Sequence, residues 1–328
     1  MKILVTGGAG YIGSHTIREL AERGHEVVAL DNLERGHAAS TQCPLIRADL
    51  RDPAATRQAL ESQSFDGVVH FAAFAAAGES VVHPEMYFEN NVGGTINLLG
   101  AMVATGVKLL VFSSSCGVYG QPSQLPVTED CERRPESPYG ESKHLVERML
   151  PWYERAHGLR AIALRYFNAA GASLDGTIGD DARPATRLIP SAIKAALGQR
   201  DAITIYGDDY PTPDGTCIRD YVHVLDLASA HALALEHLAD GAPGDFLNVG
   251  AGVGYSNRQV VEMIRRVSGV DFPIRIGLRR PGDPAEVYAD NSKIRRVLGW
   301  EPKHSDLETI IRTDWGWHSR HPDGYGDR

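Results

Sequence analysis

The segment Ser137–Lys143 (SPYGESK) combines residue types that suit acid–base chemistry. Ser137 is a favoured helix N-cap and Pro138 a favoured first helical residue, so a helix is predicted to begin here. Tyr139 and Lys143 then lie four residues apart on one face of it. A phenol has an ordinary pKa of about 10, and a nearby positive charge favours the phenolate that can act as a base. The alternative interpretation is an ordinary exposed contact between the two side chains.

Three serines, Ser113–Ser115, follow the apolar run Leu109–Phe112, which is typical of a buried strand. A hydroxyl at the end of this strand can hydrogen-bond a substrate oxygen. A serine, a tyrosine and a lysine beside a dinucleotide suggest oxidation of an alcohol by hydride transfer, in which Tyr139 takes the hydroxyl proton.

The N-terminus carries a pattern typical of a dinucleotide site. The apolar run at residues 2–6 leads into three glycines, each three residues after the last: Gly7, Gly10 and Gly13. Such a turn lets a pyrophosphate approach the backbone at a helix N-terminus, although a plain sharp turn is the alternative. Asp31 ends the next apolar run, where a carboxylate can accept from both ribose hydroxyls of NAD and repels the 2′-phosphate of NADP. Arg35 favours NADP, but the carboxylate makes NAD the predicted cofactor.

These residues must be positioned by strands and helices that alternate along the chain. Continuous apolar runs separated by helical patterns predict a parallel sheet covered on both faces. We therefore expect a doubly wound, Rossmann-like α/β domain over residues 1–167, with Asp49-Leu50 and Phe71-Ala72 ending strands at the same edge. Residues 168–328 are expected to form a smaller α/β substrate domain, from which about 222–238 could pack back on the first.

Composition excludes several classes of function. The chain has 328 residues and a formal net charge of −9, which disfavours binding to nucleic acid or anionic lipid. Four cysteines without CxxC spacing fit a reducing cytoplasm, and no apolar run is long enough for a signal peptide or a membrane span. The thirteen histidines show no metal-ligand spacing, so no metal is expected, and His70 is interpreted as a core residue.

Longer motifs indicate a family. They include TGGAGYIG, HFAA, GESV, NNVGGT, SSSCGVYG, SPYGESK, GDDYPTPDGTCIRDYVHV, LNVGAGVGYS and RRPGDPAEVYAD. With these motifs the chain resembles the UDP-glucose (UDP-galactose) 4-epimerase family, within the extended short-chain dehydrogenase/reductase superfamily, from residue 1 to about 325. The resemblance implies tightly held NAD⁺ that takes hydride from C4 of a UDP-hexose, a 4-keto intermediate that swings about its link to the diphosphate, and return of the hydride to the other face.

The resemblance also implies roles for individual residues. Ser115 corresponds to the serine that binds the 4-oxygen, Tyr139 to the base and Lys143 to the cofactor-ribose ligand. The implied NAD contacts are Gly7, Gly10, Tyr11, Ile12, Gly13, Asp31, Asn32, Asp49, Leu50, Phe71, Ala72, Asn90, Tyr139, Lys143 and Tyr166. The implied UDP-sugar contacts are Ser115, Asn168, Leu188, Tyr206, Arg219, Arg280, Asp283 and Val287. A homodimer through two apolar helices, around residues 84–104 and 138–157, is expected on the same grounds.

The sequence departs from the family pattern at four positions. Gly117 stands where some members carry Thr, Ala75 where some carry Lys, and Arg187 where Asn or His is common. Val287 aligns with a bulky Tyr that walls off space beside the sugar C2 in some members. Losing that ring should enlarge the pocket, so we expect turnover of UDP-GlcNAc and UDP-GalNAc as well, unless the valine is packed as ordinary core.

Rival functions on the same scaffold are a UDP-pentose 4-epimerase, a dehydratase and a decarboxylase. A dehydratase needs an added acid and base after the serine strand, but Cys116-Gly117 occupies that place. A non-catalytic NAD-binding sensor is a further alternative, although it could dispense with the Tyr139/Lys143 pair and with two arginines suited to phosphate, Arg219 and Arg280.

Overall fold

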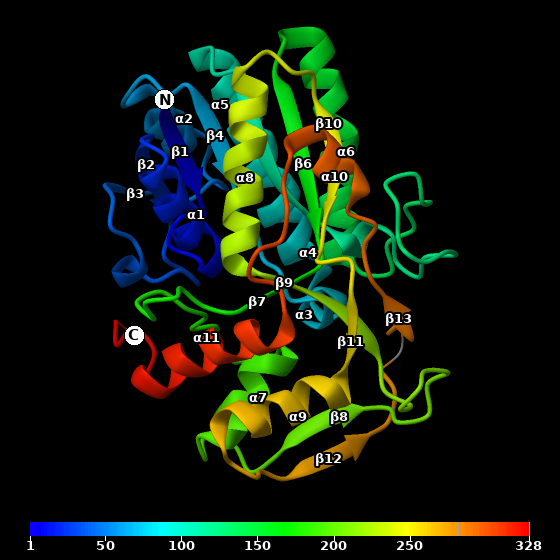
Figure 1. The fold of residues 1–328 in the computed structure, drawn as a ribbon. Helices are drawn as coiled ribbons and strands as arrows, with labels where there is room; N and C mark the ends of the chain where they lie inside the picture. The colour runs from blue at the N-terminus through cyan, green and yellow to red at the C-terminus, as the bar shows by residue number, and fades with distance from the viewer. Residues whose placement is uncertain (281, 328) are drawn as a thin grey trace.

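A seven-stranded parallel sheet forms the larger part of the molecule (Figure 1). The protein is described here by a computed structural model, over residues 1–280 and 282–327. The strand order is β3-β2-β1-β4-β5-β6-β10, and every neighbouring pair is parallel. Its strands are β1 (Lys2–Thr6), β2 (Glu26–Asp31), β3 (Leu45–Arg47), β4 (Gly67–His70), β5 (Leu109–Ser115), β6 (Arg160–Tyr166) and β10 (Asp245–Val249). The predicted doubly wound α/β fold is confirmed.

Helices cover both faces of this sheet because each strand is apolar on both sides. Ile3 and Val5 point into one buried cluster, whereas Leu4 points into the other. The first cluster is covered by α1 (Tyr11–Glu22), α8 (Val224–Ala239) and α10 (Ser292–Leu298). The second is covered by α2 (Pro53–Glu61), α5 (Gly94–Thr105) and α6 (Pro138–His157).

A smaller lobe lies below the carboxyl ends of the strands in Figure 1. It contains the helices α7 (Leu188–Ala196), α9 (Asn257–Ser268) and α11 (Leu307–Arg320). Its strands are β7 (Asn168–Ala170), β8 (Ile203–Tyr206), β9 (Ile218–His223), β11 (Gly254–Ser256), β12 (Ile274–Gly277) and β13 (Glu286–Val287). Strand β9 pairs with β7, β11 and β13, while β8 pairs with β12. The helices share a core with β8 and β9.

Short helical segments connect these layers. They are α3 (Ala77–Val82), α4 (Pro84–Tyr87), the π-helical η2 (Phe88–Gly93), and the 3₁₀ turns η1 (Ala38–Ser40) and η3 (Cys116–Val118). Among the described residues, no helix is long and apolar enough to cross a membrane.

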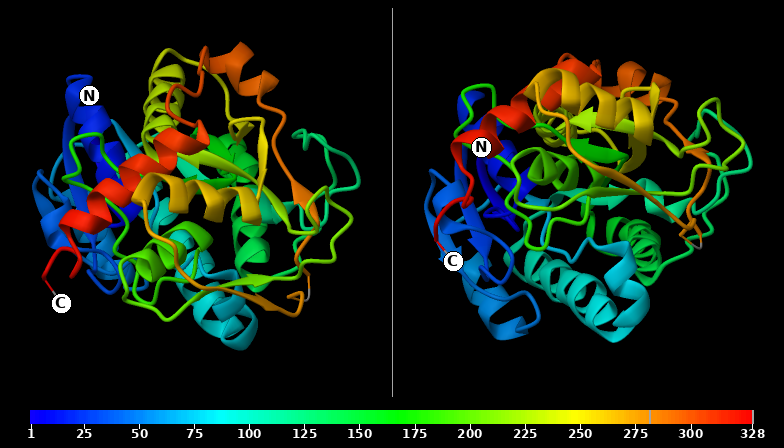
Figure 2. Two further views of the ribbon diagram at one scale, coloured as in Figure 1. Left: turned by 60° about the horizontal axis from the view of Figure 1, so that its bottom comes forward. Right: turned by 90° about the horizontal axis from the view of Figure 1, so that it is seen from below.

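The chain passes between the two parts more than once. After the smaller lobe begins at β7, α8 returns to pack against α1, and β10 joins the large sheet beside β6. Near the C-terminus, Asp327 Oδ1 lies 2.6 Å from Nδ1 of His37, a residue that follows β2. Figure 2 shows the red C-terminal segment beside the blue N-terminal part of the molecule. A domain boundary at residue 167 remains a prediction, but the element order shows that segments after it help to build the large sheet.

Candidate active site

The carboxyl ends of the parallel strands bring together many of the predicted site residues. Asp31, Ser115 and Tyr166 end β2, β5 and β6, while Gly7 and Phe71 directly follow β1 and β4. In a parallel sheet these ends share one edge, and ligands of such folds bind there. The positions predicted from the ends of apolar runs therefore converge in space.

The glycine turn at this edge is closed too tightly for side chains. Gly7 has a φ of +70°, and a Cβ on it would lie 2.5 Å from the backbone nitrogen of Ala72. A Cβ on Gly13 would lie 2.3 Å from the carbonyl oxygen of Gly7. Helix α1 follows, and its N-cap Gly10 supplies no capping side chain. The N–H groups of the first turn, which includes Tyr11 and Ile12, are therefore suited to an anion such as a diphosphate.

Next to this turn, the end of β2 presents a carboxylate. Asp31 is buried, and its side chain accepts hydrogen bonds from Ala9 N at 3.0 Å and Leu33 N at 2.8 Å. Arg35 instead directs its guanidinium to Glu79, with distances of 3.0 and 2.9 Å to the two carboxylate oxygens. Because Arg35 is committed to Glu79, the arrangement suits a ribose diol better than a 2′-phosphate.

The neighbouring strand ends are held by polar contacts. Asn32 Nδ2 donates to Asp49 Oδ2 at 3.0 Å, and hydrogen bonds from Arg51 lower the pKa of Asp49 to about 2. Asn90 lies in η2 and donates to Asn91 Oδ1 at 3.0 Å. The other predicted contacts near this edge are the buried Leu50 and the half-buried Phe71 and Ala72.

His70, one residue before Phe71, lies in the core. Its two ring nitrogens are 2.6 Å from Thr6 Oγ1 and 2.9 Å from Thr95 Oγ1, and burial lowers its pKa to about 3. It is a satisfied neutral histidine, as interpreted from the sequence.

Lys143 lies in the interior of α6, with 3% of its surface exposed. Its ammonium donates to Ser113 O at 2.7 Å, and the Ser113 hydroxyl lies 2.7 Å from Tyr166 OH. Burial lowers the pKa of Lys143 to about 7, although Glu147 opposes this shift. This hydrogen bond uses one of the three N–H groups of the Lys143 ammonium, which also lies 5.0 Å from the centre of the Phe112 ring. The other N–H groups are suited to a ligand.

Tyr139 and Ser115 lie close together beside Gly117: a Cβ on Gly117 would lie 3.3 Å from Ser115 Oγ and 3.9 Å from Tyr139 Cε1. Burial raises the pKa of Tyr139, while the Ser115 side chain opposes the rise. The predicted contribution of Lys143, together with the positive ring of bound NAD⁺, to the phenolate remains a prediction.

Several predicted substrate residues form a chain of contacts in the smaller lobe. Asp283 accepts from Arg219 Nη2 at 3.4 Å and from Arg280 Nε at 2.8 Å. The Arg280 guanidinium lies 5.0 Å from the centre of the Tyr206 ring. Two cations are thus gathered beside an aromatic face and a carboxylate, which suits a nucleoside diphosphate.

The remaining predicted substrate residues lie on neighbouring elements. Val287 is paired in register with Arg219 between β13 and β9, and Asn168 Nδ2 donates to Asp220 O at 2.9 Å. Leu188 begins α7 and is half-buried.

Sequence reasoning missed the residues that hold these groups in place. Ser80 and Asn91 reach α6 from other helices: Ser80 Oγ accepts from Tyr139 N at 3.1 Å, and Asn91 Nδ2 donates to Ser142 Oγ at 3.0 Å. Glu147 binds Arg165 through both carboxylate oxygens, at 2.9 and 2.8 Å. Each contact joins segments far apart in the chain, so no local spacing signals it.

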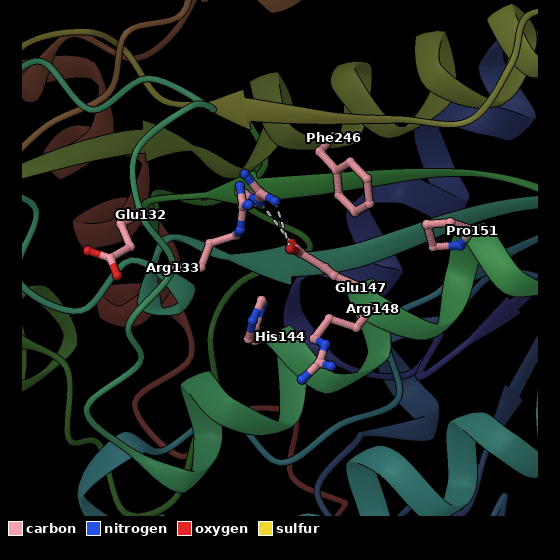
Figure 3. Close-up of a pocket in the computed structure, with 8 residues that line it drawn as sticks. Glu132, Arg133, His144, Glu147, Arg148, Pro151 and Phe246 are labelled. Carbon is pink, nitrogen blue, oxygen red and sulfur yellow. Dashed lines mark hydrogen bonds and ion pairs between the residues drawn. The ribbon is translucent and has the colours of Figure 1, made fainter.

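A surface pocket lies beside Glu147 but apart from the predicted site. It is lined by Glu132, Arg133, His144, Glu147, Arg148, Pro151, Arg165 and Phe246 (Figure 3). None of these belongs to the predicted catalytic, cofactor or substrate residues.

Comparisons with known proteins identify the family. The NAD dependent epimerase/dehydratase family model matches residues 3–250. The UDP-glucose 4-epimerase of Halalkalibacterium halodurans is 50% identical over 99% of this chain and 98% of its own length. The solved structure of UDP-glucose 4-epimerase from Brucella ovis in complex with NAD has a TM-score of 0.94 at 46% identity, covering 99% of this chain and 98% of that one. The UDP-Glc/GlcNAc 4-epimerase from Campylobacter jejuni has a TM-score of 0.85 at 42% identity, covering 97% of this chain and 99% of that one.

The chain belongs to the UDP-glucose 4-epimerase family. NAD dependence fits this site. Gly7 and Gly13 pack directly against backbone atoms, and this closes the tight turn that lets a diphosphate approach the backbone. Within this family, the position of Gly117 is informative. A Cβ there would lie 3.3 Å from Ser115 Oγ, so any larger side chain at this position would contact the Ser115 hydroxyl.

The other two departures differ in their contacts. Arg187 forms an ion pair with the buried Asp180, and its guanidinium lies 5.2 Å from the centre of the Tyr11 ring. An arginine at this position therefore places a cation beside the first turn of α1. Ala75 is exposed.

Proposed function

We propose that this protein interconverts UDP-glucose and UDP-galactose by inverting C4 of the hexose. The observation that carries the proposal is that Ser115 and Tyr139 lie together beside the buried Lys143, at the same sheet edge as the glycine turn and Asp31. An alcohol bound there meets an acid–base pair next to a dinucleotide site.

Tyr139 is the proposed base. It takes the proton of the 4-hydroxyl and later returns it to the same oxygen, so that no proton is gained or lost overall. Ser115 donates a hydrogen bond to this oxygen. When bound, NAD⁺ accepts the hydride from C4 and gives it back, and its positive ring favours the phenolate. Lys143 holds the cofactor ribose with the donors that Ser113 leaves unused.

The UDP part is proposed to bind in the smaller lobe. Arg219 and Arg280 supply charge for the two phosphates, which an acidic protein of net charge −9 must provide locally. Asp283 accepts from the uridine ribose, and Tyr206 lies beside the uracil. Asn168 and Leu188 complete this side of the site. Because the phosphates stay fixed, the hexosyl ring can turn about its link to them and present its other face.

We also propose that the site accepts UDP-GlcNAc and UDP-GalNAc. Val287 is 8% exposed and packs near Val118 and Phe167, so a small side chain stands where a ring would extend further. The Campylobacter jejuni relative is described as acting on UDP-Glc and UDP-GlcNAc. Replacing Val287→Tyr should lower kcat/KM for UDP-GlcNAc at least tenfold more than for UDP-galactose, by about the selectivity that pocket size provides. Equal effects on both sugars, or no turnover of UDP-GlcNAc by the native protein, would refute this.

The experiment that tests the main proposal uses the purified protein without added NAD. UDP-galactose, UDP-GlcNAc and a UDP-pentose are supplied separately, and ¹H NMR follows the products. UDP-glucose is expected from UDP-galactose, with no other product. A stable 6-deoxy-4-keto sugar would indicate a dehydratase instead. We expect epimerisation, because Cys116 and Gly117 occupy the place of the acid and base that a dehydratase adds after the serine strand.

We further propose that the protein is a cytoplasmic homodimer. All four cysteines are unpaired, which fits a reducing compartment. Ile96 on α5 is 44% exposed and Trp152 on α6 is 63% exposed, so each helix presents apolar surface to a partner. Sedimentation equilibrium should give twice the monomer mass, and the double change Ile96→Glu with Trp152→Glu should give the monomer.

A further inference from the structure

The backbone amide of Tyr139 is bound from outside its own helix. Tyr139 is the second residue of α6, and such an amide has no acceptor within the helix. Ser80 Oγ, on α3, accepts it at 3.1 Å. The Ser80 hydroxyl in turn donates to Ala77 O at 2.6 Å, and the side chain is fully buried. Because its donor and acceptor are both used, this hydroxyl has a fixed direction.

A second serine caps the next amide of the same helix. Ser137 Oγ accepts from Gly140 N at 3.2 Å and is the ordinary N-cap of α6. The two serines therefore make similar hydrogen bonds to adjacent backbone groups. Of these two serines, only Ser80 binds the Tyr139 amide, and only Ser80 comes from another helix. The two serines therefore offer a matched comparison.

Helix α3 is itself fixed to the cofactor side of the site. Glu79, the neighbour of Ser80, receives two hydrogen bonds from Arg35, which lies four residues after Asp31. Tyr87 OH also lies 2.7 Å from Glu79 Oε2. Glu79 thus joins the loop that follows β2 to the helix that carries Ser80.

We infer that Ser80 is a positioning residue that sets where the Tyr139 phenol lies, and that the Arg35–Glu79 pair links this position to the loop that bears Asp31. The inference rests on the proposed function, in which Tyr139 is the base. Ser80 touches no reacting atom in this scheme and acts only through the backbone of Tyr139.

The test compares Ser80→Ala with Ser137→Ala in the full-length protein as purified. Ser80→Ala should lower kcat for UDP-galactose about tenfold with little change in KM, because a small displacement of a base is costly. It should also shift the pH profile of kcat. Ser137→Ala should lower the unfolding midpoint by a similar amount but leave kcat and its pH profile within about twofold of the native values.

A second variant keeps the inference testable if Ser80→Ala folds poorly. Glu79→Gln preserves size but weakens the pair with Arg35, and it should lower kcat about two- to threefold. The control Glu61→Gln alters a surface pair with Arg57 on α2 and should leave kcat unchanged. Combined with Ser80→Ala, Glu79→Gln should have a smaller effect than alone, because both act through α3.

Three results would overturn the inference: unchanged kcat in Ser80→Ala, equal losses in Ser80→Ala and Ser137→Ala, or equal losses in Glu79→Gln and Glu61→Gln. A native protein that epimerises UDP-galactose but fails these comparisons loses only the positioning role. A native protein with no epimerase activity, or one in which Tyr139→Phe stays active, would refute the proposed function instead.

Discussion

Two successive turns of α6 bury charged side chains in different ways. Lys143 donates a hydrogen bond to the carbonyl of Ser113, and burial lowers its pKa to about 7. Glu147, one turn later, accepts from Arg165 at 2.9 and 2.8 Å (Figure 3). It also accepts from Ser114 Oγ at 2.6 Å. The Lys143 ammonium is hydrogen-bonded to a neutral carbonyl and lies 5.0 Å from the centre of the Phe112 ring, whereas the Glu147 carboxylate is paired with a buried cation. One helix thus separates two roles. The turn at Lys143, here called the acting turn, belongs to the candidate site, whereas the turn at Glu147, the anchoring turn, binds the helix to β6 through Arg165.

The largest effect is expected from the acting turn. Tyr139→Phe should lower kcat about 10³-fold or more, because the proposed base loses its proton acceptor. The NAD content, measured by absorbance after denaturation, should stay near that of the native protein. Tyr153→Phe on the same helix is the control and should be fully active. Normal turnover by Tyr139→Phe would remove the distinction between the two turns.

The anchoring turn should respond in stability. Glu147→Gln leaves the Arg165 guanidinium, whose side chain is 3% exposed, without its counter-charge. Removing one partner of a buried pair costs about 3–5 kcal/mol, so urea unfolding should show a fall of this size. Glu61→Gln, in an exposed pair, should change the unfolding free energy by less than about 1 kcal/mol. Similar changes in both variants would contradict an anchoring role.

Lys143→Met should lose activity but not stability, unlike Glu147→Gln. It should lower kcat about 10²-fold, by loss of a positioned donor. Its free energy of unfolding should hold or rise, because a buried ammonium with one neutral partner is costly to keep charged. Kinetics and urea unfolding on the same preparation check both results, and a loss of stability like that of Glu147→Gln would make the two turns alike.

The smallest effect is a pH dependence of stability. The pKa of Lys143 is about 7 in the folded protein and near 10.4 in an unfolded chain. Between these values the unfolded state binds more protons, so the unfolding free energy should rise with pH, by at most about 1.4 kcal/mol per pH unit. Lys143→Met should remove this slope, whereas Lys303→Met, at an exposed lysine, should keep it. A slope unchanged in Lys143→Met would contradict the lowered pKa.

Much of the cofactor edge could be predicted because strand ends are visible in the sequence. The apolar runs stop at Asp31 and just before Ser113, and parallel strands bring such stops to one edge. The i, i+4 spacing of Tyr139 and Lys143 likewise follows from helix geometry alone.

Other features depend on contacts between distant segments and could not be predicted. Ser80 binds the amide of a residue 59 positions later, and Arg165 pairs with Glu147 across 18 positions. Burial raises the pKa of Tyr139 and lowers that of Lys143, and burial is likewise a property of the folded molecule. The pairing of β10 with β6 could likewise not be predicted, because segments of the smaller lobe lie between the two strands in the sequence.

The position of β10 at the edge of the large sheet has a consequence for how the chain folds on the ribosome. Residues 245–249 pair with β6 and replace its seven-residue edge by a five-residue one, yet they emerge only after β7, β9 and α8 have been made. Until then β6 presents an open row of backbone donors and acceptors that can pair with other chains. A fragment ending at residue 167 should therefore aggregate, and one that reaches β10 should not.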